Sequence, residues 1–376
     1  MQDINKRTWA QVSLERIKSN YLSIKKSLPE GCGFMGMVKS DAYGHGALEV
    51  SRALQEIGCD YLAVACLDEA LELRATGIEL PLLILGYTPP QFVEKVADCG
   101  IAQNLISLQA AREYSKVLEG SGKTLKIHLK LETGMGRTGF DVKHGDVSAV
   151  VSALSLPGFE AEGVFTHFAV SDECDGEDYT RAQFERFTSA VEKIRQQSGV
   201  EFKIKHCANS GAVINYPEMH LDMVRPGLAL YGCYPGADRG SVELLPAMEL
   251  KSRISQVFTI EKGESVGYGC TFTADKKTTV AVLPIGYGDG LHRCLSGKID
   301  VLINGKRCPQ IGRICMDMCM ADVSDCEGVA TGDVAVIFGR DGDEFIPVEE
   351  LAEKAGSISY EMFCALSPRV PRFYCK

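Results

Sequence analysis

The sequence lacks the features of several large protein classes. Its 15 cysteines include no C-x-x-C pair and its seven histidines form no H-E-x-x-H motif, so neither a zinc ribbon, a thioredoxin-type site nor a metalloprotease-type metal centre is expected. No apolar run approaches the roughly 18 residues of a membrane span. The N-terminal segment MQDINKRTWAQVSLERI contains no apolar core of a secretory signal. We therefore expect a cytoplasmic chain with no membrane partner and no catalytic metal.

Positively charged residues are fewer than negatively charged ones. Lys and Arg number 40 against 50 Asp and Glu, which gives a formal net charge of −10 and a pI near 5.3. Nucleic acid and anionic membranes both attract basic surfaces, so neither is expected as a partner. What the chain does have is length and an ordinary composition. Its 376 residues, 45% of them hydrophobic, predict a globular protein of two domains.

Short apolar runs alternate with amphipathic stretches over the first two thirds of the chain. Eight runs are candidate strands: FMGMV (34–38), YLAVACL (61–67), LLILGY (82–87), QNLI (103–106), LKIHLKL (125–131), EGVFTHF (162–168), FKIKHCA (202–208) and VRPGLALYG (224–232). Helical patterns lie between them, such as LDEALELRATG (67–77), where Asp68 is the expected N-cap. Eight strand–helix units over about 220 residues predict an α/β fold with an N-terminal (β/α)8 TIM-type barrel.

A segment rich in Gly and Pro, GCYPGADRGSVELLPAM (232–248), interrupts this alternation. Beyond it, runs such as SRISQVFTI, TVAVLPIG and DVAVIFG are typical of strands. Asn304-Gly305 between two apolar runs predicts a hairpin turn, because both residues tolerate positive φ. The sequence therefore predicts three segments: residues 1–9, which join the β domain; residues 10–240, the barrel; and residues 241–376, a C-terminal, mainly β domain.

Lys39 lies where barrel enzymes carry their chemistry. It follows the first predicted strand, in VKSDAYGHG (38–46), and is therefore expected at the C-terminal mouth of the barrel. Partly desolvated surroundings favour the neutral amine that imine formation requires. Taken alone, such a lysine is more typical of an exposed loop.

A pattern typical of phosphate binding occurs at the last two predicted strands. In HCANSGA (206–212), Asn209, Ser210 and Gly211 can open a helix, and Gly227 in RPGLALYG (225–232) allows close backbone approach. Loops after strands seven and eight commonly bind phosphate in barrel enzymes. An amine and a phosphate site at one mouth fit pyridoxal 5'-phosphate. They equally fit a sugar-phosphate aldolase that works through an imine, and an ordinary capping turn is the structural alternative.

Nine motifs, in the same order along the chain, resemble those of the alanine racemase family. They are VKSDAYGHG, LETGMGRTGF, EGVFTHFA, HCANSGA, MVRPGLALYG, VGYGCTF, LPIGYGDG, GRICMD and LSPRVPRFY, and the resemblance extends from Thr8 to Tyr374. That family joins a pyridoxal-phosphate barrel to a β domain, and its relatives include serine racemases of vancomycin-resistance systems. The resemblance implies an isomerase that interconverts L- and D-alanine with pyridoxal 5'-phosphate and supplies D-alanine for cell-wall peptidoglycan.

The resemblance also implies roles for individual residues. Lys39 would carry the cofactor and act as one acid/base. Tyr268, from the β domain of a partner subunit, would be the other, because racemisation needs proton carriers on both faces of the α-carbon. The active sites would then be shared across a homodimer. Arg225 would face the pyridine nitrogen and disfavour transamination. The other cofactor-binding residues would be Tyr43, Leu85, His167, Asn209, Ser210, Gly227, Leu228 and Tyr360.

Further residues would serve the amino-acid substrate, again by resemblance. Arg137 and the backbone of Met316 would bind its carboxylate. Lys130 matches a lysine that family members often carry as a carbamate to orient that arginine, and an unmodified Lys130 is the alternative. Asp317 and Tyr287 would support the site. The access corridor would be lined by Asp172, Tyr287, Arg293, Arg313 and Ile358.

Three other functions are compatible with parts of this pattern. A serine racemase is the nearest, but Tyr360 narrows the pocket and favours alanine, since serine-preferring relatives tend to have a smaller amide there. A decarboxylase on the same scaffold would need a different second acid/base and room for a longer substrate. A protein that only holds pyridoxal phosphate typically has the barrel alone, so the β domain with Tyr268 argues against it.

Overall fold

The structure, a computed structural model, describes residues 6–236 and 242–375. Its internal contacts divide the chain into two compact units. The barrel unit comprises Ile17–Ala42 and Ala47–Leu245, and the β unit comprises Met1–Arg16, Tyr43–Gly46 and Pro246–Lys376. The predicted boundary at residues 240 and 241, and residues 1–5 of the predicted N-terminal segment, lie outside the described residues. The domain bounds given above therefore stay a prediction.

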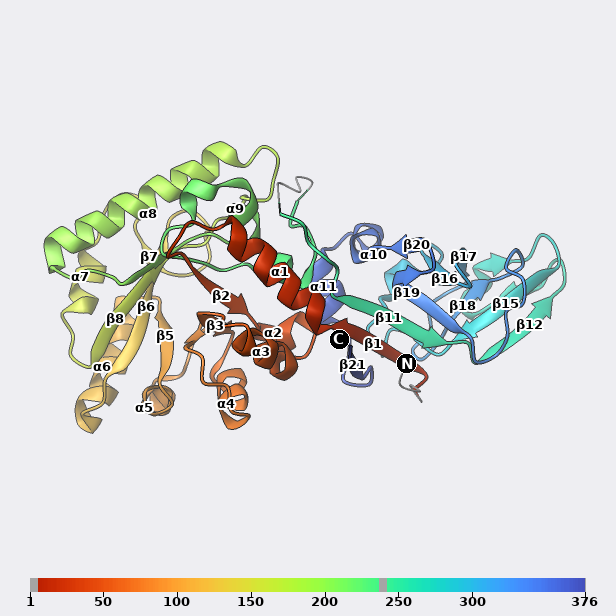
Figure 1. Ribbon diagram of the computed structural model, residues 1–376, viewed down its shortest axis with the longest axis horizontal. Helices are drawn as coiled ribbons and strands as arrows, with labels where there is room; N and C mark the ends of the chain where they lie inside the picture. The colour runs from red at the N-terminus through yellow and green to blue at the C-terminus, as the bar shows by residue number, and fades with distance from the viewer. Residues whose placement is uncertain (1–5, 237–241, 376) are drawn as a thin grey trace. The chain divides into compact units, whose positions relative to one another are not determined.

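Parallel strands form a nearly closed barrel in the barrel unit (Figure 1), which confirms the predicted fold class. Their order is β10–β2–β3–β4–β5–β6–β8–β9. Their bounds are β2 Gly33–Met37, β3 Tyr61–Val64, β4 Leu82–Ile84, β5 Ile101–Leu105, β6 Leu125–Glu132, β8 Phe159–Phe165, β9 Ile204–His206 and β10 Met223–Val224. Asp222 N donates to Lys205 O (3.1 Å) and Arg225 N to Ala208 O (2.8 Å), which joins the β9 and β10 segments.

Four barrel strands, β2, β3, β4 and β10, are continuous apolar runs, as strands covered on both faces require. Every residue of β3, β4 and β5 is buried. The pairing of β6 with β8 contains one irregularity. Ile127 pairs with Ala161 but His128 pairs with Gly163, so Glu162 is the extra residue of a β-bulge.

Helices follow most barrel strands and lie outside them (Figure 1). Their bounds are α1 Leu14–Ser27, α2 Lys39–Tyr43, α3 Ala47–Glu56, α4 Leu67–Ala75, α5 Val93–Asp98, α6 Leu108–Ser121, α7 Ser148–Leu154, α8 Glu177–Ser198 and α9 Ser210–Asn215. Shorter elements are η1 Pro90–Phe92, β7 Phe140–Asp141, η2 Pro217–Met219 and η3 Leu228–Tyr231. The predicted N-cap Asp68 is wrong, because α4 begins at Leu67 after Cys66. Asp68 lies in the first turn, where its negative charge still favours the helix N-terminus.

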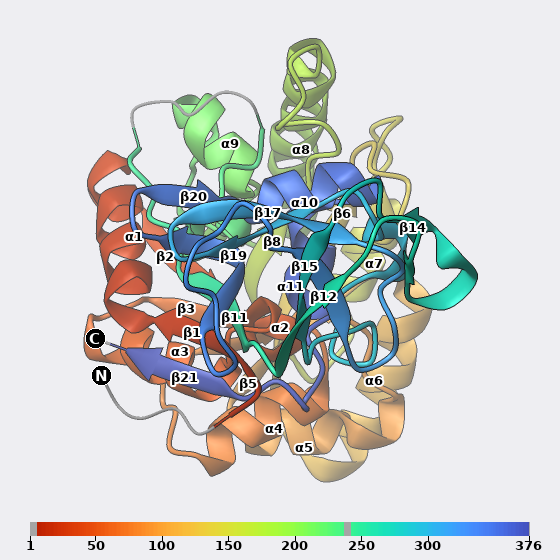
Figure 2. The same ribbon diagram turned by 90° about the vertical axis from the view of Figure 1, so that its right-hand side faces the viewer.

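The β unit is built on one large sheet (Figure 2). Its strand order is β12–β15–β18–β17–β16–β19–β11–β1–β21, and β20 pairs with β19. The bounds are β1 Thr8–Ser13, β11 Met248–Arg253, β12 Gln256–Ile260, β15 Thr278–Leu283, β16 Asp300–Ile303, β17 Lys306–Ile311, β18 Cys319–Asp322, β19 Val334–Asp341, β20 Glu344–Ile346 and β21 Arg372–Cys375. Asn304 (φ 50°) and Gly305 (φ 72°) join β16 to β17, so the predicted hairpin turn is confirmed.

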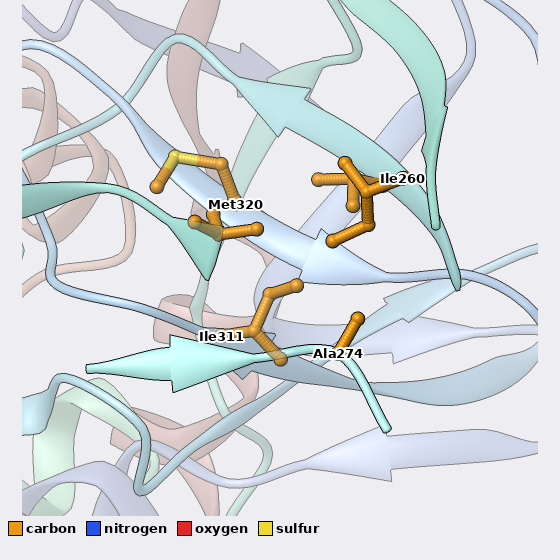
Figure 3. Packing of buried hydrophobic residues seen from close by; sticks show 6 residues of the cluster. Ile260, Ala274, Ile311 and Met320 are labelled. Carbon is orange, nitrogen blue, oxygen red and sulfur yellow. The ribbon is translucent and has the colours of Figure 1, made fainter. Parts of the chain in front are cut away.

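A small hairpin packs on this sheet. Strands β13 Ser265–Val266 and β14 Phe272–Thr273 flank the turn η4 Tyr268–Cys270. Figure 3 shows the core beside the hairpin, with Ile260, Ile311 and Met320 of the sheet and Ala274, which follows β14. Val266 of β13 belongs to the same buried cluster. This apolar contact fixes the base of the loop that carries Tyr268. The unit also contains η5 Arg293–Leu295, α10 Val348–Ala355 and α11 Ser359–Cys364.

Three further properties concern the described ranges. No helix in them is both long and apolar enough to cross a membrane. All 15 cysteines lie within them and are free thiols. Within residues 6–236 and 242–375, no three His, Cys, Asp or Glu side chains gather in a group that could hold a metal ion.

Candidate active site

Lys39 lies two residues after the end of strand β2, at Met37, and is half-buried. The next four residues, 40–43, all have φ between 50 and 53°. This left-handed conformation costs residues other than glycine roughly 1–2 kcal/mol each. The N–H of Ser40 donates to Glu69 Oε1 (2.7 Å), which helps to fix the turn. Backbone strain of this kind persists where surrounding contacts determine it, and it is common at active sites.

Positive charges gather at this end of the barrel. Burial is the main cause that lowers the pKa of Lys130 to about 7, with contributions from the charges of Arg225, Arg137 and Lys39 and an opposing effect of Glu132. Lys130 is 5% exposed and Arg225 is 4% exposed. A cluster of cations, two of them buried, attracts anionic ligands, and a lysine that is partly neutral can react as an amine. The structure therefore brings four of the predicted site residues together.

Arg225 is held by neutral acceptors. Its Nη1 donates to His206 Nδ1 (2.8 Å), and its Nη2 donates to the carbonyls of Thr166 (2.8 Å) and Cys207 (3.2 Å). A longer contact of 3.4 Å joins Nη2 to His167 Nδ1. Burial, together with the charge of Arg225, holds the pKa of His167 well below its usual value, so this imidazole is neutral. Burial lowers the pKa of Arg225 itself to about 10, and the guanidinium stays charged near neutrality.

Ser210 organises the backbone at the start of α9. Its hydroxyl accepts hydrogen bonds from the N–H groups of Gly227 (2.9 Å) and Ala229 (3.2 Å). Leu228, between these two donors, is 4% exposed. Asn209 caps the helix, as its side chain accepts from the N–H of residue 212 at 3.0 Å. The predicted helix start is confirmed, and phosphate binding by these residues stays a prediction.

Leu85 is fixed at the end of β4. Its N–H donates to Val64 O (2.9 Å), and its carbonyl accepts from Asn104 Nδ2 (2.6 Å). The residue therefore lies at the same end of the barrel strands as Lys39.

Two tyrosines that are predicted to bind the cofactor meet in the β unit. The rings of Tyr43 and Tyr360 pack edge to face, with their centroids 5.3 Å apart. Tyr43 is 6% exposed, and burial raises the pKa of its hydroxyl, so the group is a neutral hydrogen-bond donor.

Tyr268 lies at the tip of the β13–β14 hairpin and is 72% exposed. Gly267 and Gly269 on either side have φ of 74° and 73°, values that favour glycine. An open, mainly apolar groove of about 490 Å³ lies beside the tyrosine. The groove is lined by Phe258, Ser265, Val266, Gly267, Tyr268, Val282, Cys315, Met318 and Met320.

The segment around Met316 is held by backbone and ionic contacts within the β unit. The Met316 carbonyl accepts from the N–H of Gly288 (2.9 Å), next to Tyr287. Met316 and Tyr287 are 53% and 43% exposed. Asp317 pairs with Arg369 at 2.8 Å. The structure thus brings together the three predicted residues of this group.

The predicted corridor residues do not gather within one unit. Asp172 belongs to the barrel unit and is half-buried. Arg293, Arg313 and Ile358 belong to the β unit, where Arg293 and Ile358 are exposed. Their role in access stays a prediction.

Sequence reasoning missed the groups behind Arg225. His206 contacts His128, and His128 contacts Glu162, all inside the barrel. The available signal was two polar residues within apolar strand patterns, His128 in LKIHLKL and Glu162 at the start of EGVFTHF. Such residues are buried only when they are hydrogen-bonded.

Comparison with family models accounts for both parts of the chain. The model of the alanine racemase N-terminal domain matches residues 12–235, and that of the alanine racemase C-terminal domain matches residues 247–374. The chain belongs to the alanine racemase family. This family uses pyridoxal phosphate.

Members of the alanine racemase family match nearly the whole chain. The alanine racemase of Methanococcus maripaludis is 44% identical over 368 residues, which covers 97% of this chain and 98% of that protein. Racemisation of alanine is accordingly the activity of the chain, as the motifs predicted.

Solved alanine racemases have the same fold. That of Clostridium difficile 630 has a TM-score of 0.93 and 38% identity, covering 99% of this chain and 97% of that chain. That of Bacillus anthracis with bound L-Ala-P has a TM-score of 0.93 and 35% identity, covering 99% and 96%.

Proposed function

We propose that the chain racemises alanine with two proton carriers, Lys39 on one face of the substrate α-carbon and the partner subunit's Tyr268 on the other. The observation that carries this proposal is the position of Lys39 at the strand end, among the charges of Lys130, Arg137 and Arg225. Two carriers are needed because the proton leaves one face of the carbon and returns to the other.

The residues of the barrel mouth fit pyridoxal 5'-phosphate. Lys39 offers an amine for covalent attachment, Arg225 offers a fixed donor for the pyridine nitrogen, and the start of α9 at Ser210 offers backbone N–H groups for the phosphate. When bound, the cofactor supplies an electron sink that makes the α-proton acidic. Arg225 donates a hydrogen bond without giving up its proton, since its pKa of about 10 lies above neutrality. The remaining proposed cofactor contacts are Tyr43, Leu85, His167, Asn209, Gly227, Leu228 and Tyr360.

Substrate binding is assigned to groups that recognise a carboxylate. Arg137 is an exposed cation near the mouth, and the backbone of Met316 is fixed by Gly288. Lys130, with a pKa of about 7, has a neutral fraction that can take up CO2, forming a carbamate and releasing one proton. The carbamate would pair with Arg137 and hold it in place. Asp317 and Tyr287 would support this region.

The second proton carrier is assigned to a partner subunit, in a homodimer with shared sites. Tyr268 is 72% exposed and lies beside an open apolar groove. A second copy of the chain would cover this surface and exclude water from the reacting atoms. The product would be D-alanine for peptidoglycan.

Alanine is assigned as the preferred substrate over serine. Tyr360 packs against Tyr43 and is half-buried, so its bulk is fixed in place. Loss of a fitted apolar contact changes selectivity by roughly 10- to 200-fold. A kcat/KM for serine comparable to that for alanine would contradict this assignment.

The test is an absorbance spectrum of the purified protein before and after borohydride reduction. Reduction should abolish the band of the lysine-bound cofactor and fix the cofactor to the peptide that contains Lys39. Chiral chromatography of alanine then measures racemisation. Labelling of a different lysine, or racemisation by a protein without the cofactor, would overturn the proposal.

A further inference from the structure

A row of hydrogen-bonded side chains leads from Arg225 into the barrel interior. Arg225 Nη1 lies 2.8 Å from His206 Nδ1, and His206 Nε2 lies 2.8 Å from His128 Nδ1. His128 Nε2 lies 3.1 Å from Glu162 Oε2, which also accepts from the Tyr61 hydroxyl at 2.9 Å. We call Arg225, His206, His128 and Glu162 the barrel chain.

The barrel chain runs from one end of the strands toward the other. Arg225 follows β10 and His206 ends β9, whereas His128 lies within β6. Glu162 meets Lys126, the second residue of β6, at 3.2 Å. The Lys126 side chain is 46% exposed, whereas both histidines are completely buried. The barrel chain therefore joins the cationic mouth to the Glu162 carboxylate, which lies near the solvent at the N-terminal ends of the strands.

The positions of the protons in the barrel chain follow from its two ends. A guanidinium only donates, so His206 Nδ1 must accept and its one proton must lie on Nε2. That proton points to His128 Nδ1, which must therefore accept, and the proton of His128 lies on Nε2. Glu162 accepts it. Burial lowers the pKa of both histidines, in agreement with two neutral rings.

The backbone is shaped around the barrel chain. Glu162 is the extra residue of the β6–β8 bulge, a feature that commonly redirects a side chain. At Gly163 an added Cβ would lie 2.4 Å from His128 Nδ1, so only glycine leaves room for the imidazole. The ring of Phe165 stacks on His206 at 4.8 Å, with an interplanar angle of 12°. These features fix both rings in the orientations that the hydrogen bonds need.

We propose that Glu162 is a positioning residue for the racemase reaction, which acts through His128 and His206 to fix the orientation of Arg225 and to moderate its charge. The proposal rests on the assignment of Arg225 to the pyridine nitrogen. Hydrogen bonds in a low-dielectric interior polarise their neighbours, so an anion at one end increases the acceptor strength of each ring in the row. His206 then binds the guanidinium more firmly, and the guanidinium withdraws less electron density from a group in front of it.

The first test uses the wild-type protein and does not require activity. Nitrogen-15 NMR of histidine-labelled protein, with and without pyridoxal phosphate, distinguishes protonated from unprotonated ring nitrogens. His128 and His206 should each carry their proton on Nε2 alone, at neutral pH. A proton on Nδ1 of either ring would contradict the proposed order of donors and acceptors in the barrel chain, and with it the proposal.

The second test removes the charge and keeps the shape. In Glu162→Gln the amide oxygen can still accept from His128 and Tyr61, so the fold should be retained. We expect kcat to fall about tenfold with KM changed less than twofold, as for outer partners of metal-ligating histidines, and the absorbance band of the bound cofactor to shift. Glu162→Asp, which keeps the charge, should recover part of the rate. An unchanged kcat and spectrum in Glu162→Gln would refute the positioning role even if the NMR result holds.

Two surface variants are matched controls. Glu160→Gln removes another carboxylate of β8, which is 42% exposed and pairs with Lys203 at 3.7 Å. Lys126→Gln removes the exposed partner of Glu162. Both should keep kcat within twofold. If the wild-type protein lacked racemase activity or the cofactor, the proposed function would be contradicted. That result differs from an active wild-type protein with an unaffected Glu162→Gln variant, which would contradict only the positioning role.

Discussion

The barrel mouth and the Tyr268 loop differ in how they hold a predicted proton carrier. Lys39 is half-buried and leads into a strained turn, beside an arginine that makes three hydrogen bonds of 3.2 Å or less. Tyr268 is 72% exposed between two glycines at positive φ. The barrel mouth is organised within one unit, whereas the tyrosine lies in an exposed turn of a hairpin whose base is fixed through Val266 in the core.

This difference implies that substitutions near Lys39 and substitutions near Tyr268 should affect the reaction in different ways. Preorganised groups in a buried site contribute to the rate without further ordering. An exposed loop contributes fully only when a partner orders it. Variants in the barrel mouth should therefore act at any protein concentration, and variants of the loop should depend on assembly.

The largest effect is expected in the barrel mouth. Lys39→Ala removes both the cofactor attachment and one proton carrier, so kcat/KM for alanine should fall by at least about 10⁴-fold. Chiral chromatography measures the loss, and circular dichroism checks the fold. The matched control Lys126→Ala, at the other end of the barrel, should stay within threefold. If kcat/KM falls less than tenfold in Lys39→Ala, Lys39 is not the proton carrier of the barrel mouth, and the comparison with the Tyr268 loop fails.

Tyr268→Phe should lower kcat by about 10²- to 10⁴-fold, the usual range for an acid/base group, with the cofactor spectrum unchanged. Co-expression sharpens the test. If sites are shared, a heterodimer of Lys39→Ala and Tyr268→Phe chains has one of its two sites complete. Purified heterodimers should then have about half of the wild-type activity, and a randomly paired mixture about a quarter. No recovery in verified heterodimers would show that each site is built from a single chain.

The hairpin base should respond as an ordinary core. Met320 is 7% exposed and lies in the buried cluster of Figure 3, to which Val266 at the base of the Tyr268 hairpin also belongs. Met320→Ala should lower the free energy of unfolding of the β unit by about 2–5 kcal/mol, measured in urea. Met318→Ala is the control, since Met318 is 45% exposed and should cost less than about 0.5 kcal/mol. Equal costs would mean that the hairpin is not anchored through this core.

The smallest effect concerns the pH dependence of stability at the barrel mouth. The pKa of Lys130 falls from 10.5 to about 7 on folding, so between these values the unfolded chain binds the additional proton. Stability should therefore rise as the pH increases from 7 to 10.5, by on the order of 1–3 kcal/mol, and Lys130→Met should lack this rise. The measurement is urea unfolding of both proteins in CO2-free buffer. Parallel pH curves for the two proteins would exclude a buried, titrating Lys130.

Much of this architecture could be predicted because it depends on local patterns. Several barrel strands are apolar runs, and Asn304-Gly305 adopts the two positive φ values that its hairpin requires. The charged cluster could also be predicted in part, since Lys39 and Arg225 each follow a strand and so lie at the same end of the barrel.

The remaining features depend on tertiary contacts that no local pattern encodes. Glu162 enters the barrel chain because a bulge shifts the register of β8, and a one-residue shift cannot be predicted from alternation. Asp68 was expected to cap α4, but the helix starts one residue before it. The run 224–232 was predicted as a strand, yet only Met223–Val224 pairs, because Gly227 ends the extended conformation and η3 follows.

The turn after Lys39 has a consequence for how the sequence can change over time. Ser40 is exposed, so glycine there would relieve the left-handed backbone without removing a buried side chain and should make the folded protein more resistant to heat. The same replacement would give the neighbouring amine more freedom and slow turnover. Selection for thermal tolerance and selection for speed therefore have opposite requirements at this position.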